Sequence, residues 1–229
     1  MNPWSRLEII YGIENVQRFR NANVMIAGLG GVGSYSAEAV CRSFVGKMTI
    51  VDFDTYDITN LNRQLHSTVE NLGRSKVDVI EENILSINPD IAIKKYDCRI
   101  EEKSIEIFFK NDKVDYVIDA IDDVNAKILL IDYCLKNDIK IISCMGTGNR
   151  TNPQAFRIAD IYKTFNCPLA KKMRKELKAR GIKRHKVVFS EETPKKSLET
   201  GDIGSNSFVP SSAGLLLASY VINDLAECN

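Results

Sequence analysis

Residues 24–34, with the sequence VMIAGLGGVGS, decide the fold of this 229-residue chain. A short apolar run over residues 24–27 leads into a glycine cluster, and the periodicity after it predicts a helix over residues 34–44. Glycine permits a tight turn in which backbone N–H groups approach a phosphate, and the N-terminus of the next helix adds partial positive charge. This order predicts a binding site for an adenine nucleotide; the alternative is a glycine turn that serves only for packing. The glycines of the pattern are Gly28, Gly30, Gly31 and Gly33.

Apolar runs alternate with helical patterns along most of the chain. Residues 5–19 form a loosely helical lead-in. Further strands are predicted over residues 48–51, 91–96, 116–121 and 139–144, and further helices over residues 75–87, 102–109 and 125–136. This alternation predicts an α/β fold, a Rossmann-like, doubly wound and mostly parallel sheet with helices on both faces. Ligands bind at the carboxyl ends of the strands in such sheets, which here carry residues 28–33, 52–63, 119–122 and 146–148.

The pattern changes after Gly148. A strand-like segment is predicted over residues 155–161, a basic helix over residues 169–180, a polar mobile loop over residues 190–206 and a final apolar helix over residues 213–226. Too few apolar positions remain in this part for a core of its own. We therefore expect one domain over residues 1–229, with a nucleotide-binding core in 1–150 and a C-terminal elaboration in 151–229.

Composition excludes several classes of protein. Hydrophobic residues make up 44% and charged residues 27% of the chain, which are globular averages and exclude global disorder. The chain has no apolar run of roughly 18 to 20 residues and no signal-peptide pattern at its start, so we expect a cytoplasmic protein that does not associate with membranes. The six cysteines are widely spread and form no pair at zinc-ligand spacing, so we expect them to be reduced and mostly buried.

The net charge of +1 conceals a strong asymmetry. Residues 168–186 contain nine basic residues and one acidic residue, so this stretch carries +8 and the rest of the chain −7. On a helix, residues 171, 174, 175 and 178 share one face, which predicts binding to a polyanion such as tRNA; an ordinary solvated helix surface is the alternative. The residues assigned to this tRNA-binding surface are Lys171, Lys172, Arg174, Lys175 and Lys178.

Polar residues beyond the glycine turn refine the nucleotide prediction. Asp52, at the end of the second strand, suits a carboxylate that accepts hydrogen bonds from ribose hydroxyls. Asn60, Arg63 and Lys76 suit a triphosphate better than the diphosphate of NAD, which argues against a dehydrogenase. In the sequence DAIDD, Asp119 and Asp122 could bring Mg²⁺ to these phosphates; a helix N-cap role for Asp122 or Asp123 is the alternative.

The motifs GLGGVGS, VDFD, TNLNRQ and DAIDD, with a lysine after NLGRS, resemble the ThiF-type adenylating domain of the ubiquitin-activating-enzyme-like superfamily. The resemblance implies ATP and Mg²⁺ as cofactors, a homodimer, and an arginine, Arg6, that reaches the triphosphate from the second subunit. It gives Asp122 as the metal ligand and Asp122, Arg63, Lys76 and Arg6 as catalytic residues. The ATP-binding residues that it implies are Gly28, Gly30, Gly31, Gly33, Asp52, Asp54, Asn60, Arg63, Lys76, Asp119 and Ile121.

The C-terminal part resembles one group of this superfamily. MGTGNRTNP, FNCPLAKKMRKELKARGIKR and GSNSFVPSSAGLLLASYVI are similar to segments of the tRNA threonylcarbamoyladenosine dehydratases. The resemblance implies ATP-dependent dehydration of threonylcarbamoyladenosine next to the anticodon of tRNA, by adenylation of the threonyl carboxylate followed by intramolecular ring closure. One position departs from it, because Cys167 stands where related chains carry an acidic residue; a thioester role for Cys167 has no use in this reaction.

Three alternatives remain at the level of sequence. An adenylyltransferase that activates the C-terminal glycine of a ubiquitin-like sulfur-carrier protein would use the same nucleotide site, but the four zinc cysteines typical of that group are absent. A tRNA-binding scaffold would keep the basic helix without needing Asp122, and an NAD-dependent reductase would leave Arg63 and Lys76 without a role. A sulfur-transfer or sulfur-acceptor protein is a further candidate partner.

Overall fold

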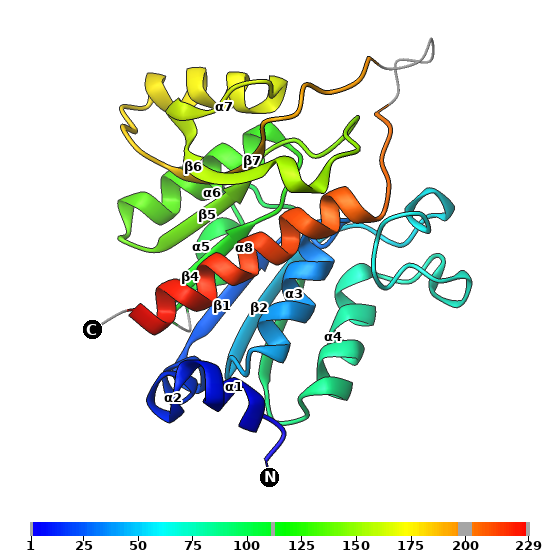
Figure 1. The fold of residues 1–229 in the computed structure, drawn as a ribbon, viewed down its shortest axis with the longest axis vertical. Helices are drawn as coiled ribbons and strands as arrows, with labels where there is room; N and C mark the ends of the chain where they lie inside the picture. Colours follow the sequence, from blue (N-terminus) through cyan, green and yellow to red (C-terminus); the bar gives the residue numbers. More distant parts are fainter. Residues whose placement is uncertain (1, 111–112, 197–202, 228–229) are drawn as a thin grey trace.

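The computed structural model describes residues 2–110, 113–196 and 203–227. A seven-stranded sheet in the order β3-β2-β1-β4-β5-β7-β6 forms the centre, with helices on both faces (Figure 1). Neighbouring strands are parallel except β6 and β7. The mostly parallel α/β fold predicted from the sequence is confirmed. The strands are β1 Asn23–Ala27, β2 Lys47–Asp52, β3 Ala92–Asp97, β4 Tyr116–Asp119, β5 Lys140–Cys144, β6 Phe156–Asp160 and β7 Lys186–Ser190.

Two apolar layers cover the sheet. In β1, Val24 and Ile26 pack into one layer, and Met25 and Ala27 into the other, as expected for a strand buried on both faces. Helices α2, α3, α4 and α8 supply the first layer, and α5, α6 and α7 the second. The helices are α1 Ser5–Tyr11, α2 Ile13–Asn21, α3 Gly33–Arg42, α4 Lys76–Ile87, α5 Ile105–Phe109, α6 Val124–Lys136, α7 Pro168–Ala179 and α8 Phe208–Glu227.

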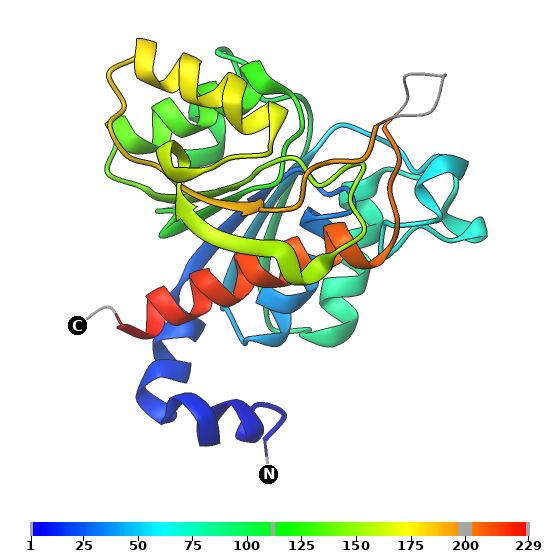
Figure 2. The same cartoon turned by 45° about the horizontal axis from the view of Figure 1, so that its top comes forward.

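The N-terminal lead-in is two helices rather than one. Gly12, with a φ of 80°, ends α1 and begins α2 in a conformation that favours glycine. The pair precedes the amino end of β1 and projects from the body of the molecule (Figure 2). This places α1 at the end of the sheet opposite to the carboxyl ends of the strands.

The C-terminal part departs most from the sequence prediction. Strand β7 was not predicted, because its apolar residues fall between the basic stretch and the polar segment; Ser190, the predicted start of the loop, ends this strand. Helix α8 begins at Phe208, five residues earlier than predicted, since Pro210 is tolerated in the first turn of a helix. The middle of the predicted mobile loop, residues 197–202, lies outside the described residues.

Helix α8 has the length and hydropathy of a membrane span, but it packs as a core helix. Val209, Ala213, Leu217 and Val221 are buried in the first apolar layer, and 44% of its most apolar window is buried. The hydroxyl of Ser36 in α3 donates to the carbonyl of Gly214, at 2.9 Å. A buried helix of a globular domain passes the same test of length and hydropathy, so the feature is weak evidence for a membrane.

Candidate nucleotide site

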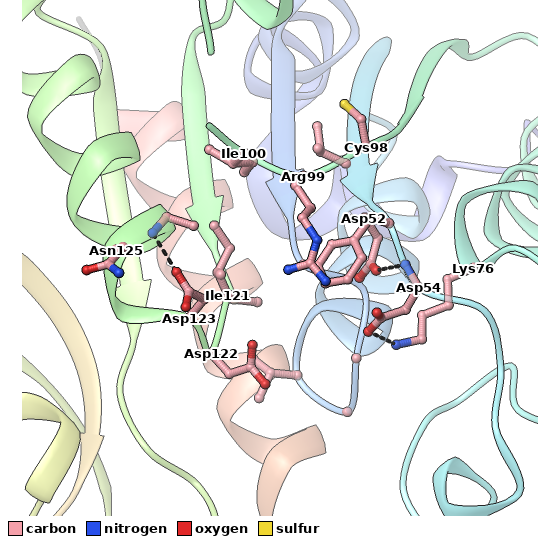
Figure 3. Close-up of a pocket in the computed structure, with 18 of the residues that line it drawn as sticks. Asp52, Asp54, Lys76, Cys98, Arg99, Ile100, Ile121, Asp122, Asp123 and Asn125 are labelled. Atoms are coloured by element: carbon pink, nitrogen blue, oxygen red, sulfur yellow. Dashed lines mark hydrogen bonds and ion pairs between the residues drawn. The ribbon is translucent and has the colours of Figure 1, made fainter. Parts of the chain in front are cut away.

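A pocket of about 980 Å³ opens at the carboxyl ends of β1, β2 and β4 (Figure 3). The segment after β3, the first turns of α6 and the start of α8 also contribute to it. Ten of the residues predicted to bind or act on the nucleotide line this one pocket. They are Gly28, Gly30, Gly31, Asp52, Asp54, Asn60, Arg63, Lys76, Ile121 and Asp122.

The glycine turn lies against the chain after β4. Gly28 has a φ of 85°, and a Cβ atom there would lie 2.8 Å from the carbonyl oxygen of Ala120. Gly33 is not one of the described residues that line the pocket. A Cβ atom on Gly33 would lie 1.7 Å from the carbonyl oxygen of Gly28. Gly33 therefore allows α3 to start directly behind the turn, which aims its N-terminus at the pocket.

Asp52 fastens the turn to the end of β2. Its Oδ2 accepts from the backbone N–H of Leu29 at 2.6 Å, and its Oδ1 from that of Asp54 at 2.9 Å. Burial raises the pKa of this carboxyl, and the nearby positive charge of Lys76 opposes the rise. Asp52 thus holds the glycine turn in shape while it lines the pocket, where a ribose hydroxyl can donate to its remaining lone pairs.

Two of the cations that line the pocket were predicted from the sequence. Lys76, the first residue of α4, is buried, and its Nζ lies 2.9 Å from Oδ2 of Asp54. Arg63 donates through Nη1 to the carbonyl of Thr59 at 2.7 Å and to Oδ1 of Asn62 at 3.0 Å. With the backbone amides of the glycine turn, these groups make a cradle for phosphates.

The two adjacent aspartates at the start of α6 have different tasks. Oδ1 of Asp123 accepts from the backbone N–H of Ala126 at 2.8 Å and caps the helix (Figure 3). Asp122 is exposed and lines the pocket, and within the described ranges no hydrogen bond or ion pair engages its carboxylate. The N-cap role that the sequence left open between them therefore belongs to Asp123.

The donor set suits magnesium that arrives with a nucleotide. Within the described part of the chain, no three His, Cys, Asp or Glu side chains form a cluster that could hold a metal ion by themselves. Mg²⁺ is commonly held by one or two carboxylates together with waters and substrate phosphates. One unengaged carboxylate, Asp122, across a phosphate cradle fits that pattern.

Asp119 does not line the pocket, and its predicted contact with ATP is wrong. Its side chain is fully buried below the pocket floor, where Oδ2 pairs with Nζ of Lys127 at 2.8 Å. Its Oδ1 accepts from the backbone N–H of Ile121 at 3.1 Å. Both oxygens are therefore engaged inside the protein.

Arg6 lies far from the pocket of its own chain. It is exposed on α1, at the opposite end of the sheet from the glycine turn (Figure 2). Action from a second subunit stays a prediction, and action in its own pocket is excluded by this placement.

The basic helix presents a lysine face, with one correction. Ala170, Met173 and Leu177 are buried in the second apolar layer, while the lysines at positions 171, 172, 175 and 178 are exposed. Arg174 is only half-exposed, because its guanidinium donates to the carbonyl and the hydroxyl of Thr164. Arg180, from the same basic stretch, lines the nucleotide pocket although it was not assigned to the tRNA-binding surface.

Comparisons with known proteins agree with this arrangement. The model of the ThiF family matches residues 5–228. The chain is 41% identical to the tRNA threonylcarbamoyladenosine dehydratase of Bacillus subtilis, over 99% of this chain and 96% of that protein. The chain belongs to the ThiF family.

Solved structures of relatives carry the nucleotide. The Escherichia coli tRNA N6-threonylcarbamoyladenosine dehydratase in complex with AMP superposes with a TM-score of 0.91 at 31% identity, covering 96% of this chain and 92% of that one. The same enzyme in complex with ATP gives a TM-score of 0.89 at 32% identity, covering 97% of this chain and 93% of that one.

In this ThiF-family pocket, sequence reasoning missed an aromatic and cationic wall. The guanidinium of Arg99, after β3, lies 3.7 Å from the ring centroid of Phe53, directly after Asp52. Phe53 is 44% exposed. The sequence signal that could have identified it is an aromatic residue directly after Asp52, the residue predicted to bind ribose. Arg99, Thr147 and Ser205 carried no local pattern, because contacts between distant segments bring them to the pocket.

Of the described cysteines of this family member, Cys98 alone lines the pocket. The five described cysteines are free, and all except Cys98 are buried, as predicted; Cys228 lies outside the described residues. Burial raises the pKa of the Cys41 thiol to about 11 and that of Cys144 to about 12, so both stay protonated. Cys167 is the N-cap of α7, where its Sγ accepts from the backbone N–H of Ala170 at 3.4 Å.

Proposed function

We propose that this chain is an ATP-dependent tRNA threonylcarbamoyladenosine dehydratase. The observation that carries the proposal is the assembly of the glycine turn, Asp52, Arg63, Lys76 and the unengaged Asp122 around one pocket. A pocket of this kind suits the activation of a carboxylate by ATP. The nearly full-length similarity to the Bacillus subtilis dehydratase selects the threonyl group of a modified tRNA as the carboxylate.

The proposed reaction loses one water in two steps. An oxygen of the threonyl carboxylate attacks the α-phosphorus of ATP, and the bond to pyrophosphate breaks, which leaves an acyl-adenylate. The neighbouring carbamoyl group then attacks the activated carbonyl, loses a proton, and expels AMP, which carries away the former carboxylate oxygen. The second step is intramolecular, so alignment costs little entropy.

The residues of this chain supply position and charge. A carboxylate is already an anion at neutral pH, so the attack requires no strong base. Arg63, Lys76 and the backbone amides of Gly30 and Gly31 are placed to neutralise and orient the phosphates, which is the main task in such reactions. We include Mg²⁺ as a cofactor held by Asp122; when bound, it neutralises charge that develops on the phosphates.

We further propose a homodimer in which Arg6 completes the partner's pocket. Leu7 and Tyr11 pack against the core, whereas Ile9 and Ile10 on the same helix are each 76% exposed. A second set of exposed apolar side chains, Ile58 and Val69, lies in the segment that carries the phosphate ligands. A two-fold dimer that buries both sets would bring Arg6 of one copy toward the phosphates of the other.

The lysine face of α7 is the proposed contact with tRNA. Its exposed lysines can follow a phosphate backbone, and Arg180 links the basic stretch to the wall of the pocket. A tRNA substrate also agrees with a cytoplasmic location.

Pyrophosphate release tests the proposal. The purified protein is given ATP and Mg²⁺ with tRNA that carries threonylcarbamoyladenosine, with a small sulfur-carrier protein, or with neither. We expect release only with the tRNA, together with loss of one water from the modified nucleoside by mass spectrometry. Release that depends on the sulfur carrier would favour the alternative adenylyltransferase, and no release in any arm would refute an adenylating enzyme.

A further inference from the structure

A fully buried ion pair lies directly beneath the pocket. Lys127 and Asp119 have no exposed side-chain surface, and Nζ lies 2.8 Å from Oδ2. A buried pair is a weak source of stability, since apolar side chains of similar size often serve as well or better. Stability therefore does not explain why this ion pair is buried here, and its contacts indicate another role.

The pair joins both ends of the short connection that carries Asp122. Asp119 is the last residue of β4, and its Oδ1 accepts from the backbone N–H of Ile121, the residue before Asp122. Lys127 lies in the first turns of α6, and its backbone N–H donates to the carbonyl of Asp123 at 3.0 Å. The ion pair thus ties the end of β4 to the first turns of α6, the two elements on either side of residues 120–123.

The same connection is in contact with the glycine turn. The backbone N–H of Ala120 donates to the carbonyl of Ala27 at 2.8 Å, and the carbonyl of Ala120 lies against Gly28. A connection held in this way keeps a constant distance between the Asp122 carboxylate and the amides that face the phosphates. Such a constant distance is what a metal shared by a carboxylate and a phosphate requires.

Two other buried polar side chains, His185 and Ser143, are hydrogen-bonded to each other. His185 on the approach to β7 pairs through Nε2 with Oγ of Ser143 in β5 at 2.7 Å. Burial and the positive charge of Lys127 lower the pKa of His185 to about 3, so the imidazole is neutral. Among the described residues, the ammonium of Lys127 forms its ion pair with Asp119.

We propose that the Lys127–Asp119 ion pair is a positioning device that holds Asp122 in place to receive Mg²⁺ bound to the phosphates of ATP. The inference rests on the proposed function only in assuming that the pocket binds ATP with magnesium. It assigns neither Lys127 nor Asp119 a contact with the nucleotide.

The test compares two double variants and one control. D119L/K127M replaces the pair with apolar side chains and removes the acceptor for the N–H of Ile121, while D119N/K127M keeps an amide oxygen as that acceptor. S143A removes a buried hydrogen bond of the neighbouring strand that does not involve the connection. Calorimetry gives the affinity for AMP and for ATP with and without Mg²⁺, and thermal unfolding reports the fold.

We expect all three variants to bind AMP within about twofold of the parental affinity. In D119L/K127M the enhancement of ATP affinity by Mg²⁺ should fall by about tenfold or more, as expected when support around a metal ligand is lost, with a smaller fall in D119N/K127M. S143A should melt at a lower temperature and keep the full enhancement.

A folded D119L/K127M protein with the parental Mg²⁺ enhancement would overturn the proposal. Failure of both double variants to fold, with S143A folded, would also overturn it, because the pair would then be a folding element. An enhancement in the parental protein without any tRNA-dependent turnover would refute the proposed function and leave the positioning role intact. A parental protein whose ATP affinity ignores Mg²⁺ would refute both.

Discussion

Residues 28–122 and residues 146–206 contribute to the same pocket, but different kinds of contact hold them in place. In the first region, backbone hydrogen bonds between adjacent strand ends set the geometry; the N–H of Gly28, for example, donates to the carbonyl of Val51 at 2.9 Å. In the second region, side chains clamp segments that are far apart in the sequence. The geometry of the first region, which we call the nucleotide side, follows from local spacing. The second region, which the proposed function assigns to the substrate and which we therefore call the substrate side, depends on tertiary contacts.

Arg150 is the centre of the second arrangement. It is 3% exposed, and its guanidinium donates to the carbonyls of Gly146, Glu192 and Asn166. The side chain of Asn206 donates in turn to the carbonyl of Arg150 at 2.8 Å. The side chain of Arg150 thus ties three segments together, and its backbone carbonyl anchors a fourth, so this region should respond to mutation differently from the glycine turn.

The largest expected effect belongs to the nucleotide side. D122A should abolish pyrophosphate release while the melting temperature and AMP affinity stay near parental values, because the Asp122 carboxylate takes part in no hydrogen bond or ion pair with the described residues. D123A is the matched control: loss of the N-cap should cost about 1 kcal/mol in the free energy of unfolding and leave turnover largely intact. Activity that is near parental in D122A, or equally lost in both variants, would contradict the metal assignment.

Arg6 tests whether the nucleotide side is complete within one chain. R6A should lower turnover by about 10³-fold with a smaller effect on ATP affinity, as for other arginines that stabilise phosphoryl-transfer transition states. A 1:1 mixture of R6A and D122A proteins that exchange subunits should recover about a quarter of the parental activity, since half of the dimers then contain one intact site. Absence of recovery despite proven exchange would place Arg6 outside a shared site.

Arg150 tests the substrate side. R150M should lower the free energy of unfolding by about 2 to 3 kcal/mol, because three buried carbonyls lose their donor. Turnover with tRNA should fall more than AMP affinity, since the hydrogen bonds of Arg150 in the described part of the chain go to Gly146, Glu192, Asn166 and Asn206 and not to the glycine turn. R150K serves as the comparison, because an ammonium cannot reproduce the fixed geometry of the guanidinium fork. If R150M lowered AMP affinity as much as turnover, the structures of the two regions would depend on each other.

The sequence predicted the nucleotide side because its physics is local. A strand, a glycine turn and a helix dictate where Asp52 and the amides lie, and the strand ends then bring Arg63 and Lys76 beside them. Asp119 was misplaced because spacing alone cannot tell which of several carboxylates in DAIDD turns inward to a buried lysine. Lys127 itself lies in an apolar helix pattern, where a long cation is ordinarily expected to reach solvent.

The substrate side could not be predicted in the same way. Besides partners at most 4 residues away, the hydrogen-bond partners of Arg150, Asn206 and Ser205 lie 16 to 143 residues away in the sequence. No local periodicity encodes such contacts. Strand β7 was missed because its apolar residues are few and stand between charged segments. The N-cap role of Cys167 was also hidden, since cysteine is a poor mimic of the usual capping residues.

The lysine face of α7 should give the smallest effect and also sharpen the contrast between the two sides. K171A/K175A/K178A leaves Arg174 unchanged, because its guanidinium holds Thr164 and its removal would disturb the fold. Each phosphate contact that is lost should reduce the slope of log affinity against log salt concentration by about 0.7 to 0.9, so a several-fold weaker affinity for tRNA is expected at physiological salt.

The measurement is tRNA affinity at two or more salt concentrations, with ATP affinity as the control that should not change. K110A/K136A is a control that removes two exposed lysines elsewhere on the protein, since Lys110 directly follows α5 and Lys136 lies in α6, where it pairs with Asp132. An unchanged salt slope in the triple variant would mean that the lysines only solvate the helix, and tRNA would then have to reach the pocket by another surface.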